Sequence, residues 1–309
     1  MKDGFGRALL TGLTRRPRRI PCRFLYDEAG SLLFERITRL DGYYLARAER
    51  ALLRQASGRI AAMVGPGLRV VEPGAGAMVK TRLLLAALDR PHAYVPIDVA
   101  GPMITAAGRA LAAEMPGLAV TPVVADFTRR LPLPADGCGP VLVFFPGSTI
   151  GNLAPAAAVR LLARLCAAAG PEGWVLVGVD PVRDPARLKA AYDDPQGVTA
   201  AFMLNLLVRA NRELGATFEP GGFLHRMRWN ATAGRVEHFL VSRRRQSVEV
   251  AGRGFHFRSG EAIHAEDCHK YPPAAFHVLA ARAGLAPAAT WLDAQGLFSL
   301  HLLRPAAAR

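Results

Sequence analysis

The feature that most constrains this chain is an apolar segment that ends on an acidic residue and continues into a glycine turn. Residues 70–82 read Val-Val-Glu-Pro-Gly-Ala-Gly-Ala-Met-Val-Lys-Thr-Arg, and a helical pattern opens after them toward Leu83. Glycine lets the main chain approach a ligand closely, and the first turn of a helix offers free N–H groups. The segment therefore predicts a cofactor-binding turn formed by Glu72, Gly74 and Gly76.

The turn alone fits several nucleotide-like cofactors. It lacks the third glycine of the dinucleotide fingerprint, which disfavours a dinucleotide-dependent oxidoreductase. An acidic residue before the first glycine suits an amine-bearing or cationic ligand, so we expect S-adenosylmethionine (SAM) rather than NAD. Asp98 ends the next predicted strand, 22 residues after Gly76, where a carboxylate can accept hydrogen bonds from both ribose hydroxyls.

Three more residues belong to the predicted cofactor site. Asp126 and Phe127 follow the third predicted strand, and together they suit the amino group and ring face of an adenine. Lys80 lies in the first turn of a helix, where the helix dipole disfavours a cation, so we expect it to bind an anion such as the SAM carboxylate. The alternatives are a helix N-cap for Asp98, an ordinary turn for Asp126 and a solvated side chain for Lys80.

Strands and helices alternate regularly from Leu68 onward. We expect strands at 68–72, 93–98, 119–125, 141–145 and 174–179, with helices at 79–88, 102–115 and 156–169. Short apolar strands that alternate with helices are typical of an α/β protein with a doubly wound parallel sheet. Such sheets bind ligands beyond the carboxyl ends of their strands.

This rhythm breaks after residue 183. Helices are expected at 184–192 and 198–214, followed by strands at 221–230, 236–245 and 248–257. A helix at 274–283 and strands at 288–292 and 298–303 then complete a Rossmann-like, seven-stranded sheet of the class I SAM methyltransferase type. The domains are therefore predicted to be discontinuous. Residues 47–182 and 272–309 would form the methyltransferase core, and residues 1–46 and 183–271 an α+β substrate-binding domain.

The formal net charge of +14 raises the question of nucleic-acid binding. Basic residues cluster at Arg15, Arg16, Arg18 and Arg19, and again at 243–245, where a strand-like segment suits an exposed sheet edge. Neither cluster is interleaved with aromatic residues, as a base-stacking surface would be. We therefore favour solvated basic faces and expect no nucleic-acid partner, with a basic SAM-dependent RNA-binding or RNA-modifying protein as a lesser alternative.

Cysteine usage and hydropathy indicate a cytoplasmic protein. Cys22, Cys138, Cys166 and Cys268 form no close pair, which predicts reduced thiols rather than a disulfide framework or a zinc site. No apolar stretch reaches the roughly 18 residues of a membrane span, and the N-terminus lacks the apolar core of a signal peptide. We expect a monomer with no membrane partner and no metal.

Several long motifs resemble, in order, those of the histidine Nα-methyltransferases of the ergothioneine pathway. The resemblance covers about residues 15–305. Its central motif is Phe-Pro-Gly-Ser-Thr-Ile-Gly-Asn-Leu at 145–153, which contains the candidate cofactor residue Thr149. The other matching segments lie at 23–31, 37–44, 192–199 and 266–271.

The resemblance implies an activity and a set of substrate residues. In that family SAM trimethylates the α-amine of L-histidine to give hercynine, an amino-acid betaine, and S-adenosylhomocysteine. Carried over by motif, Asn152 and Tyr192 should bind the substrate carboxylate, and Tyr43 should lie by the α-amine as the catalytic residue. Tyr26 should line the pocket. Glu266 should accept from the imidazole N–H, with Cys268 at the second imidazole contact.

Two positions depart from the family pattern. Cys268 stands where the family usually has serine, and a thiol is a weaker hydrogen-bond donor than a hydroxyl. His238 stands where the histidine enzyme has a pocket methionine, so the pocket differs in shape and polarity. An Nα-methyltransferase of the same family acting on a different amino acid is therefore the main alternative.

Overall fold

The computed structural model describes residues 4–133 and 139–306, so Cys138 lies outside the described residues. The chain divides into two compact units. The first, here called the insert unit, comprises Met1–Tyr44 and Arg183–His269. The second, the core unit, comprises Leu45–Val182 and Lys270–Arg309.

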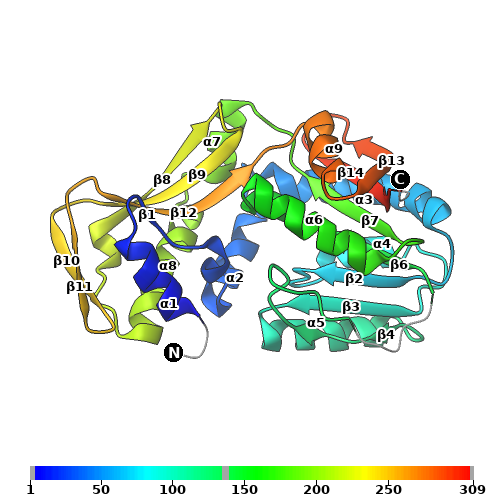
Figure 1. The fold of residues 1–309 in the computed structure, drawn as a ribbon, viewed down its shortest axis with the longest axis horizontal. Helices are drawn as coiled ribbons and strands as arrows, with labels where there is room; N and C mark the ends of the chain where they lie inside the picture. Colours follow the sequence, from blue (N-terminus) through cyan, green and yellow to red (C-terminus); the bar gives the residue numbers. More distant parts are fainter. Residues whose placement is uncertain (1–3, 134–138, 307–309) are drawn as a thin grey trace. The chain divides into compact units, whose positions relative to one another are not determined.

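The core unit is built on one sheet with strand order β13-β14-β7-β6-β2-β3-β4 (Figure 1). Its parallel strands are β2 (Arg69–Pro73), β3 (Ala93–Asp98), β4 (Ala119–Val120), β5 (Val123–Val124), β6 (Val141–Phe145) and β7 (Trp174–Val179). The closing strands β13 (Leu285–Leu292) and β14 (Ser299–Pro305) run antiparallel. This arrangement confirms the predicted α/β class with its Rossmann-like sheet.

The sheet has eight strands, whereas seven were predicted. The single strand expected at 119–125 is broken into β4 and β5, and both pair with β3. The break falls at Thr121 and Pro122, and Pro122 has no N–H with which to continue the ladder.

Helices cover both faces of this sheet because successive strand residues point to opposite sides. Val70, Leu142 and Phe144 pack with α3 (Tyr44–Val64), α4 (Val79–Leu85) and α5 (Gly101–Glu114). Val71, Val143 and Phe145 pack with α6 (Pro155–Ala169) and α9 (Pro273–Ala281). A strand that is buried on both faces reads as a continuous apolar run, and this explains why the core strands were predictable.

The insert unit combines a small sheet with its own helices. Strands β1 (Arg18–Arg19), β12 (Ala262–His269), β9 (Arg235–Ser242) and β8 (Phe223–Asn230) lie in that order. A separate hairpin joins β10 (Gln246–Val250) and β11 (Arg253–Phe257). The helices are α1 (Phe5–Thr14), α2 (Glu28–Ile37), α7 (Pro185–Tyr192) and α8 (Val198–Leu214). Short 3-10 turns lie at Cys22–Leu25 and Pro220–Gly222 here, and at Thr149–Asn152 in the core unit.

Two expectations for the insert unit were wrong, and one strand was missed. The strand predicted at 248–257 is a hairpin that turns at Ala251 and Gly252, whose φ angles are 48° and 77°. The strand predicted to reach residue 245 ends at Ser242, so Arg244 and Arg245 lie in a connecting bend rather than on a sheet edge. Strand β12 was not expected at all, because charged and imidazole side chains interrupt its apolar pattern.

None of the helices in the described ranges is both long and apolar enough to cross a membrane.

Candidate functional site

The glycine turn of the core unit brings three strand ends together. Gly74 and Gly76 adopt φ angles of 75° and 50° between β2 and α4. A Cβ atom on Gly74 would lie 3.3 Å from the Phe127 ring, so the main chain passes close to the end of β5. The Gly76 N–H donates to Asp98 Oδ2 at 3.1 Å, which fixes the end of β3. The predicted cofactor residues Gly74, Gly76, Asp98 and Phe127 therefore lie side by side.

The two aspartates of this region differ in what holds them. Asp98 accepts from main-chain N–H groups on both oxygens, from Gly76 and, at 3.1 Å, from Ala100. Ala100 is the N-cap residue of α5, so Asp98 is not its cap. Oδ1 of Asp126 accepts from both the N–H and the hydroxyl of Thr128, the pattern of an ordinary turn. Asp98 thus has its carboxylate fixed by the turn, and Asp126 has part of its capacity used locally.

Glu72 is buried beneath the turn. Its Oε2 accepts from Tyr94 at 2.5 Å and from the Thr81 hydroxyl, so it ties β2 to β3 and α4. Burial raises the pKa of Glu72 to about 7 despite these two donors and the nearby Lys80 charge. Both contacts of this oxygen are made with side chains of the fold itself, so in this structure Glu72 stabilises the glycine turn.

An ion pair that the sequence did not reveal lies beside the turn. The Lys80 ammonium is 2.7 Å from Oε2 of Glu49, a buried residue of α3. Oε1 of Glu49 accepts from the Gly147 N–H at 2.7 Å. A Cβ atom on Gly147, whose φ is 80°, would lie 3.0 Å from Lys80 Nζ. The anion facing Lys80 in this structure is thus a carboxylate of the protein itself.

The loop after β6 carries Thr149 and Asn152. The Thr149 hydroxyl donates to the Pro146 carbonyl at 3.0 Å. Helix α6 begins at Pro155 with Ala154 as its N-cap residue, so Asn152 does not cap it. The neighbouring Ser148 hydroxyl accepts from the Asp180 N–H at 3.0 Å. These contacts shape the loop at the carboxyl end of β6, the edge where such sheets bind ligands.

A buried ion pair lies at the carboxyl end of β7. The Lys270 ammonium is 2.5 Å from Asp180 Oδ2, and both side chains are almost wholly buried. Oδ1 of the same carboxylate accepts from the Val182 N–H at 2.9 Å. The segment that follows β7 is therefore stabilised by an ion pair as well as by apolar packing.

In the insert unit, aromatic rings connect four of the predicted substrate residues. Tyr43 lies edge-on to Tyr192 at 6.0 Å between ring centroids, and Tyr192 lies 5.6 Å from His238. Tyr26 packs against Phe34 and Phe202. Burial raises the pKa of Tyr26 well above its usual value, and the nearby Glu266 adds to the shift.

Strands β9 and β12 place the remaining residues on one face. Glu266 pairs with His238 in the antiparallel register, and Cys268 lies two residues further along β12. Because side chains alternate along a strand, all three point to the same side of the sheet. One ligand atom from each lies within 4.8 Å of the others. The structure thus brings His238, Glu266 and Cys268 together.

Two further residues of this region were missed from the sequence. His225 on β8 has its Nε2 2.8 Å from His238 Nδ1, and the two rings stack at 5.1 Å. Burial and the Glu266 charge raise the pKa of Cys22 to about 12, so this thiol stays protonated at neutral pH. An isolated histidine on a strand and a cysteine in a 3-10 turn carry no local signal of a site.

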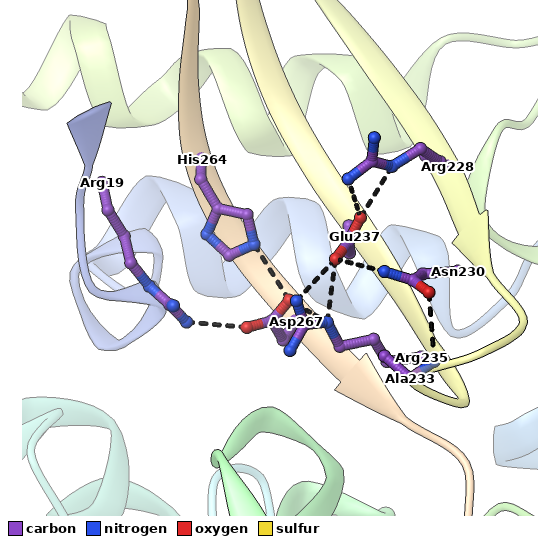
Figure 2. Close-up of polar contacts among 8 residues, drawn as sticks. All are labelled: Arg19, Arg228, Asn230, Ala233, Arg235, Glu237, His264 and Asp267. Atoms are coloured by element: carbon purple, nitrogen blue, oxygen red, sulfur yellow. Dashed lines mark hydrogen bonds and ion pairs between the residues drawn. The ribbon is translucent and has the colours of Figure 1, made fainter. Parts of the chain in front are cut away.

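The opposite face of the same two strands holds an ion network (Figure 2). Glu237 accepts from Arg228, Asn230 and Arg235, and Asp267 binds Arg19, Arg235 and His264. Burial by itself would raise the pKa of Asp267, but the His264 hydrogen bond and the arginine charges outweigh it and lower this pKa to about 2. The ion network on the opposite face therefore restrains the strand pair that carries His238 and Glu266.

Comparisons with known proteins confirm the family that the sequence motifs resemble. A family model described as "Histidine-specific methyltransferase, SAM-dependent" matches residues 5–305. The chain is 40% identical to a histidine N-alpha-methyltransferase of Mycolicibacterium smegmatis, covering 97% of this chain and 94% of the relative. It is 39% identical to the protein of that name from Mycobacterium tuberculosis, covering 96% and 93%.

A solved structure shares the fold. It is a SAM-dependent methyltransferase from Clostridium acetobutylicum, 9% identical, with a TM-score of 0.50 over 85% of this chain and 96% of that chain.

Proposed function

The chain belongs to the histidine-specific, SAM-dependent methyltransferases, and we propose that it transfers methyl groups from SAM to the α-amino group of L-histidine to give hercynine. The observation that carries this proposal is Glu266. It is a buried carboxylate, 6% exposed, on strand β12, paired in register with His238 and near enough to Tyr26 to raise the pKa of that phenol. A carboxylate accepts hydrogen bonds and donates none, so at this place it favours a substrate side chain that donates one, as an imidazole N–H does.

We propose that the core unit binds SAM. The close approach of Gly74 to Phe127 and the fixed Asp98 carboxylate fit a nucleoside. Asp98 would accept from the ribose hydroxyls, with Asp126 and Phe127 at the adenine and Thr149 nearby. Lys80 would bind the SAM carboxylate in competition with Glu49. Bound SAM supplies the electrophilic methyl group and leaves as S-adenosylhomocysteine.

The substrate roles carried over from the family form the second part of the proposal. Asn152 and Tyr192 would donate to the amino-acid carboxylate, and Glu266 with Cys268 would bind the imidazole. The Tyr43 hydroxyl would accept a hydrogen bond from an N–H of the α-amine and so orient the nitrogen lone pair toward the methyl group of SAM. The ring contacts between Tyr43 and Tyr192 support this assignment, because packing restricts both rings.

Methyl transfer from a sulfonium is an in-line displacement, so positioning supplies much of the rate enhancement. The amine nitrogen must approach unprotonated, and each transfer before the last releases a proton to water. Successive methylation ends in a fixed positive charge, which the faces of Tyr26 and Tyr43 can hold by cation–π attraction. We propose three transfers and no requirement for a metal ion.

An Nα-methyltransferase of the same family with another amino acid is the second candidate. The observation that favours it is the His225–His238 pair. His238 is a polar side chain where the family has an apolar one, and its Nδ1 lies 2.8 Å from His225 Nε2. A pocket lined by two imidazoles would favour a substrate side chain that is smaller or differently polar.

The structure offers little support for an RNA-binding role. Arg18 is 3% exposed and lies 2.9 Å from Glu261, and Arg19 pairs with Asp267. Arg244 pairs with Glu219. Three of the seven arginines in the two basic clusters therefore pair with acidic residues of the protein itself. We further propose that the protein is a cytoplasmic monomer. In the part of the chain that the structure describes, Cys22, Cys166 and Cys268 form no disulfide, in keeping with a reducing compartment.

One experiment tests the activity and both alternatives. The protein is incubated with SAM and each of the twenty amino acids separately, and products are detected by mass. We expect L-histidine to gain three methyl groups. Methylation of a different amino acid with histidine unchanged would establish the second candidate, and no methylation of any free amino acid would refute both.

A further inference from the structure

The insert unit gathers an imidazole, a carboxylate and a thiol in its interior. His238, Glu266 and Cys268 are 0%, 6% and 7% exposed. Each offers one ligand atom, and these atoms all lie within 4.8 Å of one another. Across residues 4–133 and 139–306, no other three side chains of these types converge in this way.

The sheet explains why the three groups converge. Glu266 and His238 are directly paired across β12 and β9, and Cys268 follows Glu266 by two residues on the same face. Side chains that project from neighbouring strands are placed more precisely than side chains on loops. The ion network on the opposite face adds a second restraint, since Asp267 lies between Glu266 and Cys268 in sequence.

We propose that His238, Glu266 and Cys268 form a binding site for a divalent transition-metal ion, with Zn²⁺ the best match, and that the bound ion blocks the amino-acid pocket. Imidazole nitrogen, carboxylate oxygen and thiolate sulfur are the ligands that zinc takes in proteins. For three atoms at most 4.8 Å apart, some point lies within about 2.8 Å of all of them, and zinc bonds measure about 2.0–2.3 Å. Small side-chain movements therefore complete the site.

His225 orients the imidazole ligand. Because His238 Nδ1 is 2.8 Å from His225 Nε2, we assign the metal to His238 Nε2. A hydrogen bond at one ring nitrogen fixes the ring and its tautomer and so aims the other nitrogen at the ion. Cys268 binds as a thiolate, and its proton passes to the solvent. Three protein ligands leave the fourth position of a tetrahedral ion to water.

The inhibitory part of the inference rests on the proposed function, whereas metal binding does not. A Glu266 carboxylate bound to the ion cannot accept from a substrate imidazole at the same oxygen. Since the methyl transfer is proposed to need no metal, the ion acts on this enzyme as an inhibitor.

Cobalt(II) provides a direct spectroscopic probe of the site. We would treat the full chain with a chelator, remove the chelator and titrate with Co²⁺. We expect one equivalent to bind with a thiolate-to-cobalt charge-transfer band and the visible bands of a tetrahedral ion. Absence of both bands, with no thermal stabilisation by Co²⁺, would overturn the site.

Matched variants locate the ion. Cys268→Ser, which introduces the residue usual in the family, should lose the charge-transfer band, whereas Cys166→Ser on α6 should keep it. His225→Ala should weaken Co²⁺ binding by about tenfold while the band remains, because the thiolate ligand is still present. A band that survives in Cys268→Ser, or disappears in Cys22→Ser, would place the ion elsewhere and overturn the assignment.

Inhibition is tested at a fixed free Zn²⁺ concentration held by a metal buffer, because histidine itself binds zinc. We expect the fractional loss of methyl transfer to be at least about tenfold more sensitive to zinc in the wild type than in Cys268→Ser. Equal sensitivity, with the cobalt band present, would leave the metal site standing and refute the blocking. A protein that binds Co²⁺ but methylates no amino acid would refute the proposed function alone.

Discussion

The core unit and the insert unit hold their candidate binding residues by different means. In the core unit, main-chain groups fix two carboxylates beside the glycine turn: Gly76 and Ala100 donate to Asp98, and Gly147 donates to Glu49. In the insert unit, side chains position one another, as in the Tyr43–Tyr192 and His225–His238 contacts. Main-chain contacts survive most substitutions, whereas side-chain contacts change with residue type. We therefore expect the members of the family to share cofactor binding and to differ in the amino acid that they methylate.

The largest expected effect is on the free energy of unfolding. It distinguishes a buried ion pair of the core unit from the partly exposed ion network of the insert unit. Asp180→Ala removes the carboxylate that faces the buried Lys270 ammonium, and should cost about 3–5 kcal/mol of unfolding free energy. Glu237→Ala should cost clearly less, because Arg228 is 63% exposed and can be solvated instead. Urea denaturation of both variants checks this, and equal losses would contradict the distinction.

The next effect is the pH dependence that Glu72 gives the core unit. Its pKa is raised to about 7 from 4.5, so its contribution is complete below about pH 4.5 and is lost as the pH rises through 7. Glu72→Gln keeps an oxygen for Tyr94 and Thr81 but does not titrate. The unfolding free energy of the wild type minus that of Glu72→Gln should fall by about 3 kcal/mol between pH 4.5 and 8. A difference that is constant with pH would show that the pKa of Glu72 is not raised in the folded protein.

Loss of a ribose contact should be smaller and confined to the cofactor. Asp98→Ala should weaken the binding of S-adenosylhomocysteine by about 100-fold, since a charged acceptor for two hydroxyls is removed. Asp126→Ala is the matched comparison, and we expect a smaller loss because Asp126 is proposed to accept from a single adenine amino group rather than from two ribose hydroxyls. Calorimetry measures both. A larger loss for Asp126→Ala would reverse the assignment of the two aspartates.

The smallest effect concerns the amino-acid carboxylate. Tyr192→Phe and Asn152→Ala should each weaken L-histidine binding by about tenfold and leave S-adenosylhomocysteine binding unchanged. Calorimetric titration of each variant with the two ligands separates these outcomes. Unchanged affinity for histidine in both variants would remove Tyr192 and Asn152 from the pocket.

Local patterns made the core unit predictable. The glycine turn, the acidic residue at the end of β3 and the doubly buried strands are all encoded over a few residues, and the structure brings Gly74, Gly76 and Asp98 together. The Lys80–Glu49 pair joins residues far apart in sequence, so no spacing reveals it. Pro122 divides the segment 119–125 into two strands, although the apolar residues on either side of it predicted one continuous strand.

The insert unit was less predictable because its signals are not periodic. Strand β12 alternates buried acids and imidazoles on both faces, so its hydrophobic pattern does not identify a strand. The hairpin turns at Ala251 and Gly252, and only the glycine is a turn signal, because alanine seldom adopts a positive φ. The family resemblance identified Glu266, Cys268 and His238, but the contact of His238 with His225 depends on the register between strands.

The central claim is that the core unit binds the cofactor while Glu266 in the insert unit selects the amino acid. The most direct test measures kcat/KM for L-histidine and for L-leucine with the wild type and Glu266→Ala, together with their affinities for S-adenosylhomocysteine. We predict that the preference for histidine falls by at least about tenfold while S-adenosylhomocysteine affinity is unchanged. An unaltered preference for histidine in Glu266→Ala would contradict the account.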